Sequence, residues 1–133
     1  MLSICYNLLV GKIDGECIVR SVSKLYHKDV YMPEFSEEEF WGGISELYMT
    51  THVLERCVEK RIPKPTIPII RSGYIFEMGA DKFGNVVKLC YRVKGKIWDY
   101  IYVVSSEGSV ITTWRQHHKD LHVTLDESRY DKS

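Results

Sequence analysis

Two residues near the middle of the chain carry side chains that could act together on one substrate group. His52 and Arg56 are four positions apart, so on a helix they share a face and can reach the same atoms. An imidazole can transfer protons near neutral pH, and a guanidinium can donate two parallel hydrogen bonds to a phosphate. A purely structural role is the alternative for both. His52 would then pack against Tyr48, and Arg56 would pair with Glu55 or Glu59.

A second group of histidines lies near the C-terminus. His117 and His118 are adjacent, and His122 follows with Asp120 in between. On a helix, His118 and His122 have a spacing at which two histidines can share a zinc ion, but the glutamate of a zincin motif is missing. We therefore expect no metal and no cofactor, and we take His117 as a candidate for a second proton-transfer residue.

Charge is neutral overall but uneven along the chain. The sequence has 18 basic and 18 acidic residues, yet residues 82–119 hold seven basic and two acidic side chains, a local net charge of +5. This stretch predicts either a solvated sheet face or a surface that contacts phosphates. The candidate phosphate contacts in it are Lys88, Arg92, Lys94 and Arg115.

Aromatic residues alternate with these basic ones, and they have two interpretations. An exposed aromatic ring beside a cation can stack on an unpaired base, whereas alternation in a strand also places one side of the strand in a core. The residues concerned are Tyr91, Trp98, Tyr100, Tyr102 and Trp114.

The secondary structure that must position these residues is predicted to change from helices to strands at Gly73. After it, a period of two predicts strands over residues 74–78, 86–93, 96–104 and 109–115. Short connections, including Lys94-Gly95, make neighbouring strands antiparallel. We therefore expect a four-stranded antiparallel meander.

Helices are expected before the meander. Ser36 and Glu39 have the spacing of a capping box, which begins a helix. Gly42-Gly43 then breaks or bends this first helix. A second helix is predicted over residues 44–61, ending before Pro63, and a short helical turn is predicted from Pro65. The buried stripe of the second helix would consist of Ile44, Leu47, Tyr48, Thr51, Leu54, Val58 and Ile62.

The termini complete a single α+β domain. Residues 2–10 and 16–22 predict a strand or hairpin around Asp14-Gly15. We expect N-terminal strands and a connection over residues 1–35, helices over 36–72, the sheet over 73–115 and a polar tail over 116–133. Helices on one face of an antiparallel sheet give the α+β class.

Composition excludes several classes of protein. With 44% apolar and 12% aromatic residues, the chain is neither disordered nor fibrous. The four cysteines, Cys5, Cys17, Cys57 and Cys90, form no Cys-x-x-Cys pair, which favours buried thiols in a reducing compartment. Apolar runs are too short to span a membrane, and the first residues do not resemble a signal peptide. We therefore expect a cytoplasmic protein that does not contact membranes.

The order of these features resembles the small RelE/barnase-type ribonuclease domains. The resemblance covers about residues 48–115. It rests on His52, on Glu55-Arg56, on Glu59-Lys60-Arg61-Ile62, on Ile67, Ile70 and Gly73, and on the last strand Val110-Ile111-Thr112-Thr113-Trp114-Arg115. Similar domains occur in toxin–antitoxin toxins, in contact-dependent or colicin-like toxin tips and in phage RegB-type nucleases.

The resemblance implies a metal-independent endoribonuclease whose 2′-hydroxyl nucleophile attacks the adjacent phosphate. It implies catalytic roles for His52, Arg56, Thr112 and Arg115, and an RNA contact for Arg61. It also implies an inhibitory antitoxin or immunity protein as a partner. The alternative is a non-enzymatic module of the same fold that binds RNA or a host protein, and a third possibility is a toxin tip released from a larger protein.

Overall fold

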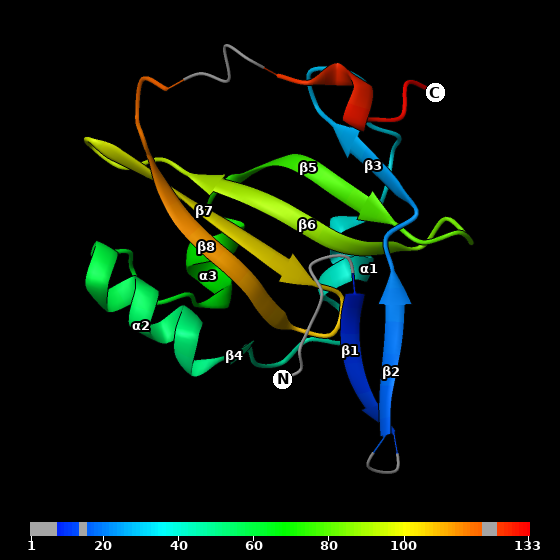
Figure 1. Ribbon diagram of the computed structural model, residues 1–133, viewed down its shortest axis with the longest axis horizontal. Helices are drawn as coiled ribbons and strands as arrows, with labels where there is room; N and C mark the ends of the chain where they lie inside the picture. The colour runs from blue at the N-terminus through cyan, green and yellow to red at the C-terminus, as the bar shows by residue number, and fades with distance from the viewer. Residues whose placement is uncertain (1–7, 14–15, 121–124) are drawn as a thin grey trace.

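A computed structural model describes residues 8–13, 16–120 and 125–133. Within these residues, a six-stranded sheet with the strand order β3-β5-β6-β7-β8-β4 occupies the centre (Figure 1). Its strands in chain order are β3 (Lys24–His27), β4 (Tyr48–Met49), β5 (Tyr74–Ala80), β6 (Val86–Val93), β7 (Trp98–Ser105) and β8 (Ser109–His117). The protein is therefore of the α+β class, as predicted.

The sheet has six strands, not the four predicted. Strands β5 to β8 follow one another as antiparallel neighbours, and a strand is added at each edge. Strand β3 pairs antiparallel with β5, although residues 23–35 were expected to be only a connection. Strand β4 pairs in parallel with β8, although its residues were expected to be helical. Both additions depend on partners distant in sequence, which local periodicity does not reveal.

Three short helices connect to this sheet: α1 (Glu37–Trp41), α2 (Thr51–Lys60) and α3 (Ile67–Arg71). Each begins at a hydroxyl that accepts a hydrogen bond from the backbone N–H three residues later, which satisfies one free donor of the first turn. The hydroxyls belong to Ser36, Thr50 and Thr66, at 3.1, 3.2 and 3.2 Å. The predicted helix start at Ser36 and the break at Gly42 are therefore confirmed.

The second helix begins later than predicted, and it buries a different face. Thr50 caps it, so residues 44–50 lie outside it. Val53 and Cys57 are its buried residues, whereas Tyr48 and Val58 are 58% and 82% exposed. The predicted stripe is wrong because it was extended from Ile44 and Leu47 across a segment that is not helical. A one-residue offset turns the buried face by about 100°.

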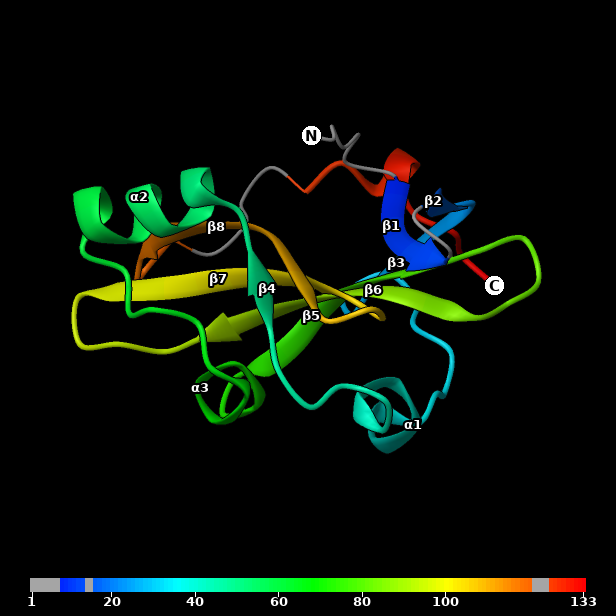
Figure 2. The ribbon, with the colours of Figure 1, turned by 90° about the horizontal axis from the view of Figure 1, so that it is seen from below.

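The two faces of the sheet are covered differently. Helices α1 and α3 lie on one side (Figure 2), where they bury a large core that includes Trp41, Ile70 and Tyr91; we call this the helix face. The other side, which we call the opposite face, holds a smaller apolar cluster of Phe76, Cys90, Ile101 and Val103. Helix α2 runs along β8, the strand next to the short edge strand β4 (Figure 1).

The described residues before β3 and after β8 also form structure. Strands β1 (Leu8–Ile13) and β2 (Glu16–Ser21) pair as an antiparallel hairpin, as predicted, while Asp14-Gly15 lies outside the described residues. The C-terminal part was expected to be a loose tail. Instead, the 3₁₀ turn η1 (Glu127–Arg129) is followed by Tyr130, which is buried. Among the described residues, no helix combines the length and apolar character needed to cross a membrane.

Candidate functional site at the end of strands β7 and β8

Two of the predicted catalytic residues, Arg115 and His117, lie together near the end of β8. Strand alternation places both on the helix face, opposite Tyr100 and Trp98 of β7. The Arg115 guanidinium lies 4.2 Å from the centre of the Trp98 ring, and its Nη1 donates to the Lys60 carbonyl at 2.9 Å. The His117 ring meets Trp98 edge-on at 5.8 Å. A stacked and hydrogen-bonded guanidinium has a fixed position, as an anion-binding group requires.

The predicted residues of α2 do not all reach this place. Arg56 donates to the Thr113 carbonyl at 3.4 Å, so its guanidinium is held against β8. His52 lies one turn before Arg56 and is exposed. Lys60 lies eight positions after His52, and at a rise of 1.5 Å per residue this is about 12 Å along the helix. The structure therefore brings Arg56 beside β8 but does not bring His52 to Arg115 or His117.

Thr112 and Lys88 lie elsewhere. Thr112 pairs with Val103, a residue of the opposite face, so its side chain is on the other side of β8 from Arg115. Lys88 is also on the opposite face, and its Nζ lies 3.6 Å from Glu77 Oε2. Both residues line one pocket, which is separate from the site described here.

Three further basic residues were predicted to contact RNA. Lys94 is exposed in the β6–β7 connection, and its Nζ lies 5.9 Å from the Tyr74 ring centre. Arg61 is exposed and ends α2 in the left-handed conformation, with φ 55°. Arg92 differs, because its side chain is only 3% exposed. Its position does not fit the predicted direct RNA contact, and we leave it out of the RNA-contacting set.

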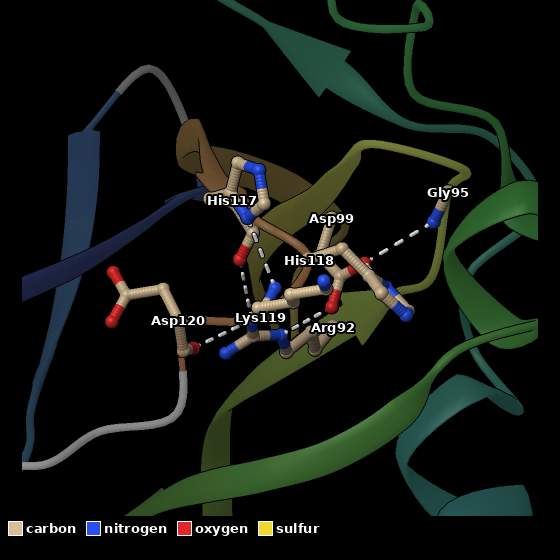
Figure 3. A network of polar contacts seen from close by, with 7 residues as sticks. All are labelled: Arg92, Gly95, Asp99, His117, His118, Lys119 and Asp120. Carbon is tan, nitrogen blue, oxygen red and sulfur yellow. Dashed lines mark hydrogen bonds and ion pairs between the residues drawn. The ribbon is translucent and has the colours of Figure 1, made fainter.

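Arg92 instead anchors a polar network at the end of the sheet (Figure 3). Its Nε donates to Asp99 Oδ2 at 2.7 Å, and its Nη2 donates to the Asp120 carbonyl at 2.9 Å. A longer bond of 3.4 Å reaches the His117 carbonyl. The buried cation is thus matched by a buried anion and by backbone acceptors, as a charge removed from water requires.

The same network contains a residue that the sequence analysis did not select as catalytic. His118 Nδ1 lies 2.9 Å from Asp99 Oδ1, and the His118 side chain is 41% exposed while that of Asp99 is 2% exposed. Because an ionised carboxylate only accepts hydrogen bonds, Nδ1 carries the proton of this bond. In the neutral ring, Nε2 is then the free acceptor. A buried aspartate thereby orients a solvent-accessible histidine.

The local fold explains why Asp99 and His118 meet. The β7–β8 ladder pairs Trp98 with His117, and the next hydrogen bond runs from the His118 N–H to the Ile97 carbonyl at 2.7 Å. His118 is therefore opposite Ile97, two positions from Asp99, so both side chains lie on the same face. Gly95 permits the tight turn before β7, because a Cβ there would lie 2.2 Å from the Trp98 carbonyl oxygen.

Electrostatics keep Asp99 ionised. Burial by itself would raise the pKa of this carboxyl group, but hydrogen bonds from His118 and Arg92, with a weaker one from the Gly95 N–H at 3.3 Å, outweigh it and lower the pKa below its usual value. A charged acceptor stabilises the imidazolium that forms when the histidine takes up a proton. The arrangement can therefore support proton transfer at His118 Nε2.

His117 and His118 do not face one another. Figure 3 shows their rings on different sides of the Arg92 guanidinium, as expected for neighbours in a strand. Three exposed cations belong to this end of the sheet: Lys119 follows His118, and Lys94 and Lys96 lie in the β6–β7 connection, just before the β7 residues that pair with the end of β8. Together with Arg115 they make this end of the sheet basic.

The described histidines are not part of a metal-binding cluster. Within residues 8–13, 16–120 and 125–133, no group of three histidine, cysteine, aspartate or glutamate side chains is placed to hold a metal ion. His118 already uses Nδ1 for Asp99, and His122 lies outside the described residues.

Comparisons with known proteins give no relative for this site. No protein-family model, no curated protein and no solved structure matches the chain.

One signal in the sequence could have identified the dyad. Asp99 is the one acidic residue in the predicted strand over residues 96–104, where every other residue except Lys96 is apolar or aromatic. A buried carboxylate needs a charged or hydrogen-bonding partner, and Arg92 on the preceding strand is a suitable one. His118 as the second partner depends on the register between β7 and β8, which the sequence alone does not give.

Proposed function

We propose that this protein is a small, metal-independent endoribonuclease related to the RelE/barnase-type domains, with His118 as its proton-transfer residue. The observation that carries the proposal is the hydrogen bond from His118 Nδ1 to the buried Asp99, which leaves Nε2 accessible. The order of elements, with helices before the antiparallel strands β5 to β8, is compatible with that family. The basic end of the sheet suits a polyanion.

In the proposed reaction, His118 Nε2 accepts the proton of a ribose 2′-hydroxyl as its oxygen attacks the adjacent phosphorus. The bond to the 5′ oxygen breaks, and the imidazolium returns the proton to that oxygen. The products are a 2′,3′-cyclic phosphate and a 5′-hydroxyl end. The exposed Lys119, next to His118 in the chain, stabilises the charge that develops on the phosphorane oxygens, whereas Arg115 lies on the other face of β8 from His118. One histidine suffices for both transfers, so the His117 ring is not required.

A second candidate function is RNA binding without cleavage. It is favoured by Trp98, whose ring already stacks with the Arg115 guanidinium at 4.2 Å. A base could extend this stack, since aromatic and guanidinium planes are common platforms for unpaired bases. In this case the contact between Asp99 and His118 would only hold the segment after β8 on the sheet.

The proposal retains an inhibitory protein partner. An active ribonuclease within a cell must be blocked, and an acidic segment is the simplest block for a basic surface. With Arg92 buried and Lys88 paired, the surface open to such a segment is formed by Lys94, Lys96, Arg115 and Lys119. We expect binding there to weaken as salt is raised.

The experiment that tests the reaction class uses a 5′-labelled single-stranded RNA in excess EDTA. We expect wild-type protein to cleave it and to leave the all-2′-deoxy oligonucleotide of the same sequence intact. His118→Gln, purified in parallel, controls for contaminating nucleases. Histidine titrates between about pH 5 and about pH 8. If the protein binds the RNA throughout this range but never cleaves it, the result contradicts the ribonuclease proposal and supports RNA binding without cleavage. Cleavage that EDTA abolishes would contradict the mechanism.

A further inference from the structure

A pocket of about 320 Å³ lies on the opposite face of the sheet. Its apolar lining comes from Phe76 of β5, Val103 of β7, and Ile111 and Trp114 of β8. The C-terminal segment supplies the other wall through Leu125, Asp126, Arg129 and Tyr130. Its volume is at the lower end of the range for small-molecule sites, about 300–1,000 Å³.

The C-terminal wall is fastened in place. The Tyr130 hydroxyl donates to Glu77 Oε1 at 2.6 Å, and the Asp131 N–H donates to the Leu25 carbonyl of β3 at 2.8 Å. The Tyr130 ring also packs against His27, with ring centres 5.1 Å apart. The pocket is therefore built by long-range contacts between the tail and the sheet edge.

A bulge in β5 forms the polar end of the pocket. The β5–β6 register shifts between Ile75 and Glu77, which puts Phe76 and Glu77 on the same side of the strand. Glu77 then accepts hydrogen bonds from the Tyr130 hydroxyl at Oε1 and from Cys90 Sγ at Oε2, at 3.5 Å, and its Oε2 forms an ion pair with Lys88 Nζ at 3.6 Å. The acceptor capacity of this buried carboxylate is thus largely used.

Most of the polar groups at the pocket that remain free to bind a ligand are hydrogen-bond donors. Lys88 has three N–H groups, of which the contact with Glu77 uses one. Arg129 lines the pocket, and in the described part of the chain no carboxylate lies within ion-pair distance of it. Thr112 adds a hydroxyl. Asp126 is occupied by its own turn, accepting from the Ser128 N–H and hydroxyl.

Covalent chemistry does not suit this pocket. Burial, with the charge of Glu77 beside it, raises the pKa of the Cys90 thiol well above its ordinary value. The sulfur therefore stays protonated at neutral pH and is a poor nucleophile. The pocket is equipped for reversible binding.

We infer that this pocket binds a small amphipathic anion, with a flat apolar body against Trp114, Ile111 and Val103 and an acidic head at Arg129, Lys88 and Thr112. Charge-assisted hydrogen bonds hold the head, and apolar burial holds the body. The inference does not depend on the proposed ribonuclease activity, because the residues of the pocket are not those of the His118 network.

The test is a ¹H–¹⁵N NMR titration with indole-3-acetate, with indole-3-acetamide as the uncharged analogue and acetate as the head without the body. We expect saturable shifts for indole-3-acetate below about 1 mM, about tenfold weaker binding of the amide, and no saturation by acetate. The shifted signals should come from Phe76, Val103, Ile111, Trp114 and the tail.

Variants separate specific from general binding. Arg129 is exposed, so Arg129→Gln should fold and weaken indole-3-acetate binding about fivefold or more, as expected for a lost charge-assisted bond. Lys132→Gln, three residues on and outside the pocket lining, should bind like wild type. Equal affinity for acid and amide, no effect of Arg129→Gln, or no saturation by about 10 mM in the folded protein would each overturn the inference.

Discussion

Two carboxylates on the opposite face of the sheet, Asp99 and Glu77, are both buried but have different surroundings. Asp99 contacts Arg92 at 2.7 Å and an exposed histidine at 2.9 Å. Glu77 has a more distant cation, Lys88 at 3.6 Å, together with a tyrosine and a thiol. Asp99 is thus hydrogen-bonded to an imidazole in contact with solvent, whereas Glu77 holds the C-terminal segment on the sheet.

The difference separates two roles that burial alone does not distinguish. A carboxylate fully matched by a guanidinium keeps its charge and can orient an imidazole. A carboxylate whose partners are Tyr130, Cys90 and a lysine at 3.6 Å mainly holds the neighbouring segments in position. We therefore assign the proton chemistry to the Asp99 network and the ligand pocket to the Glu77 network.

The largest predicted effect comes from breaking the Asp99 network. Asp99→Ala leaves the Arg92 guanidinium buried without its counter-ion, and we expect a loss of about 3–5 kcal/mol in the free energy of unfolding. Glu38→Ala removes an exposed ion pair with Arg71 at 2.6 Å and should cost less than about 1 kcal/mol. Urea unfolding measures both. Similar losses for the two variants would show that the Arg92–Asp99 pair is not buried as described.

The Glu77 network predicts a smaller loss. Tyr130→Phe removes a hydrogen bond to a carboxylate and should cost about 1.5–3 kcal/mol. Tyr102→Phe is the matched control, because its hydroxyl donates to the neutral Pro63 carbonyl at 2.8 Å and should contribute only about 1 kcal/mol. Tyr130→Phe should also speed proteolysis of the C-terminal segment. If Tyr130→Phe unfolds at the wild-type urea midpoint, the tail is not anchored through Glu77.

Acid unfolding gives the smallest and most specific difference. The pKa of Asp99 is lowered in the folded protein, so its carboxylate stabilises the fold above the unfolded pKa of about 3.9. That contribution is lost as the pH falls through the folded-state pKa. We expect stability to fall more steeply below about pH 4 in wild type than in Asp99→Asn, measured as urea midpoints against pH. Parallel curves would remove the argument for a stabilised Asp99 anion.

Local patterns predicted part of the fold. Alternation located β6 with both of its ends, 86 and 93, and located most of β5, β7 and β8. A capping hydroxyl located α1. The patterns failed where a distant partner decides the structure: Tyr48 and Met49 pair with Ser109 and Val110, although Tyr48 continues a helical apolar spacing. The tail looked polar, yet Tyr130 is buried through Glu77.

The site was predicted less completely than the fold. Residue type and position gave Arg115 and His117, which the structure places near each other, and Arg56, which it holds against β8. His52 fitted a helical spacing, but the length of α2 separates it from the end of the sheet. His118 could not be preferred over His117, because strand register decides which of two adjacent histidines lies beside Asp99.

The most direct measurement is the single-turnover rate of RNA cleavage in EDTA by wild type, His118→Gln, Asp99→Asn and His52→Gln, each checked for folding by circular dichroism. We predict a loss of about a hundredfold or more for His118→Gln, the scale of general acid–base catalysis. The cleavage rate of Asp99→Asn should lie between those of His118→Gln and wild type. The rate of His52→Gln should stay within about twofold of wild type, because His52 lies outside the network. A His118→Gln protein that cleaves at the wild-type rate, or a loss confined to His52→Gln, would contradict the assignment of the chemistry to His118.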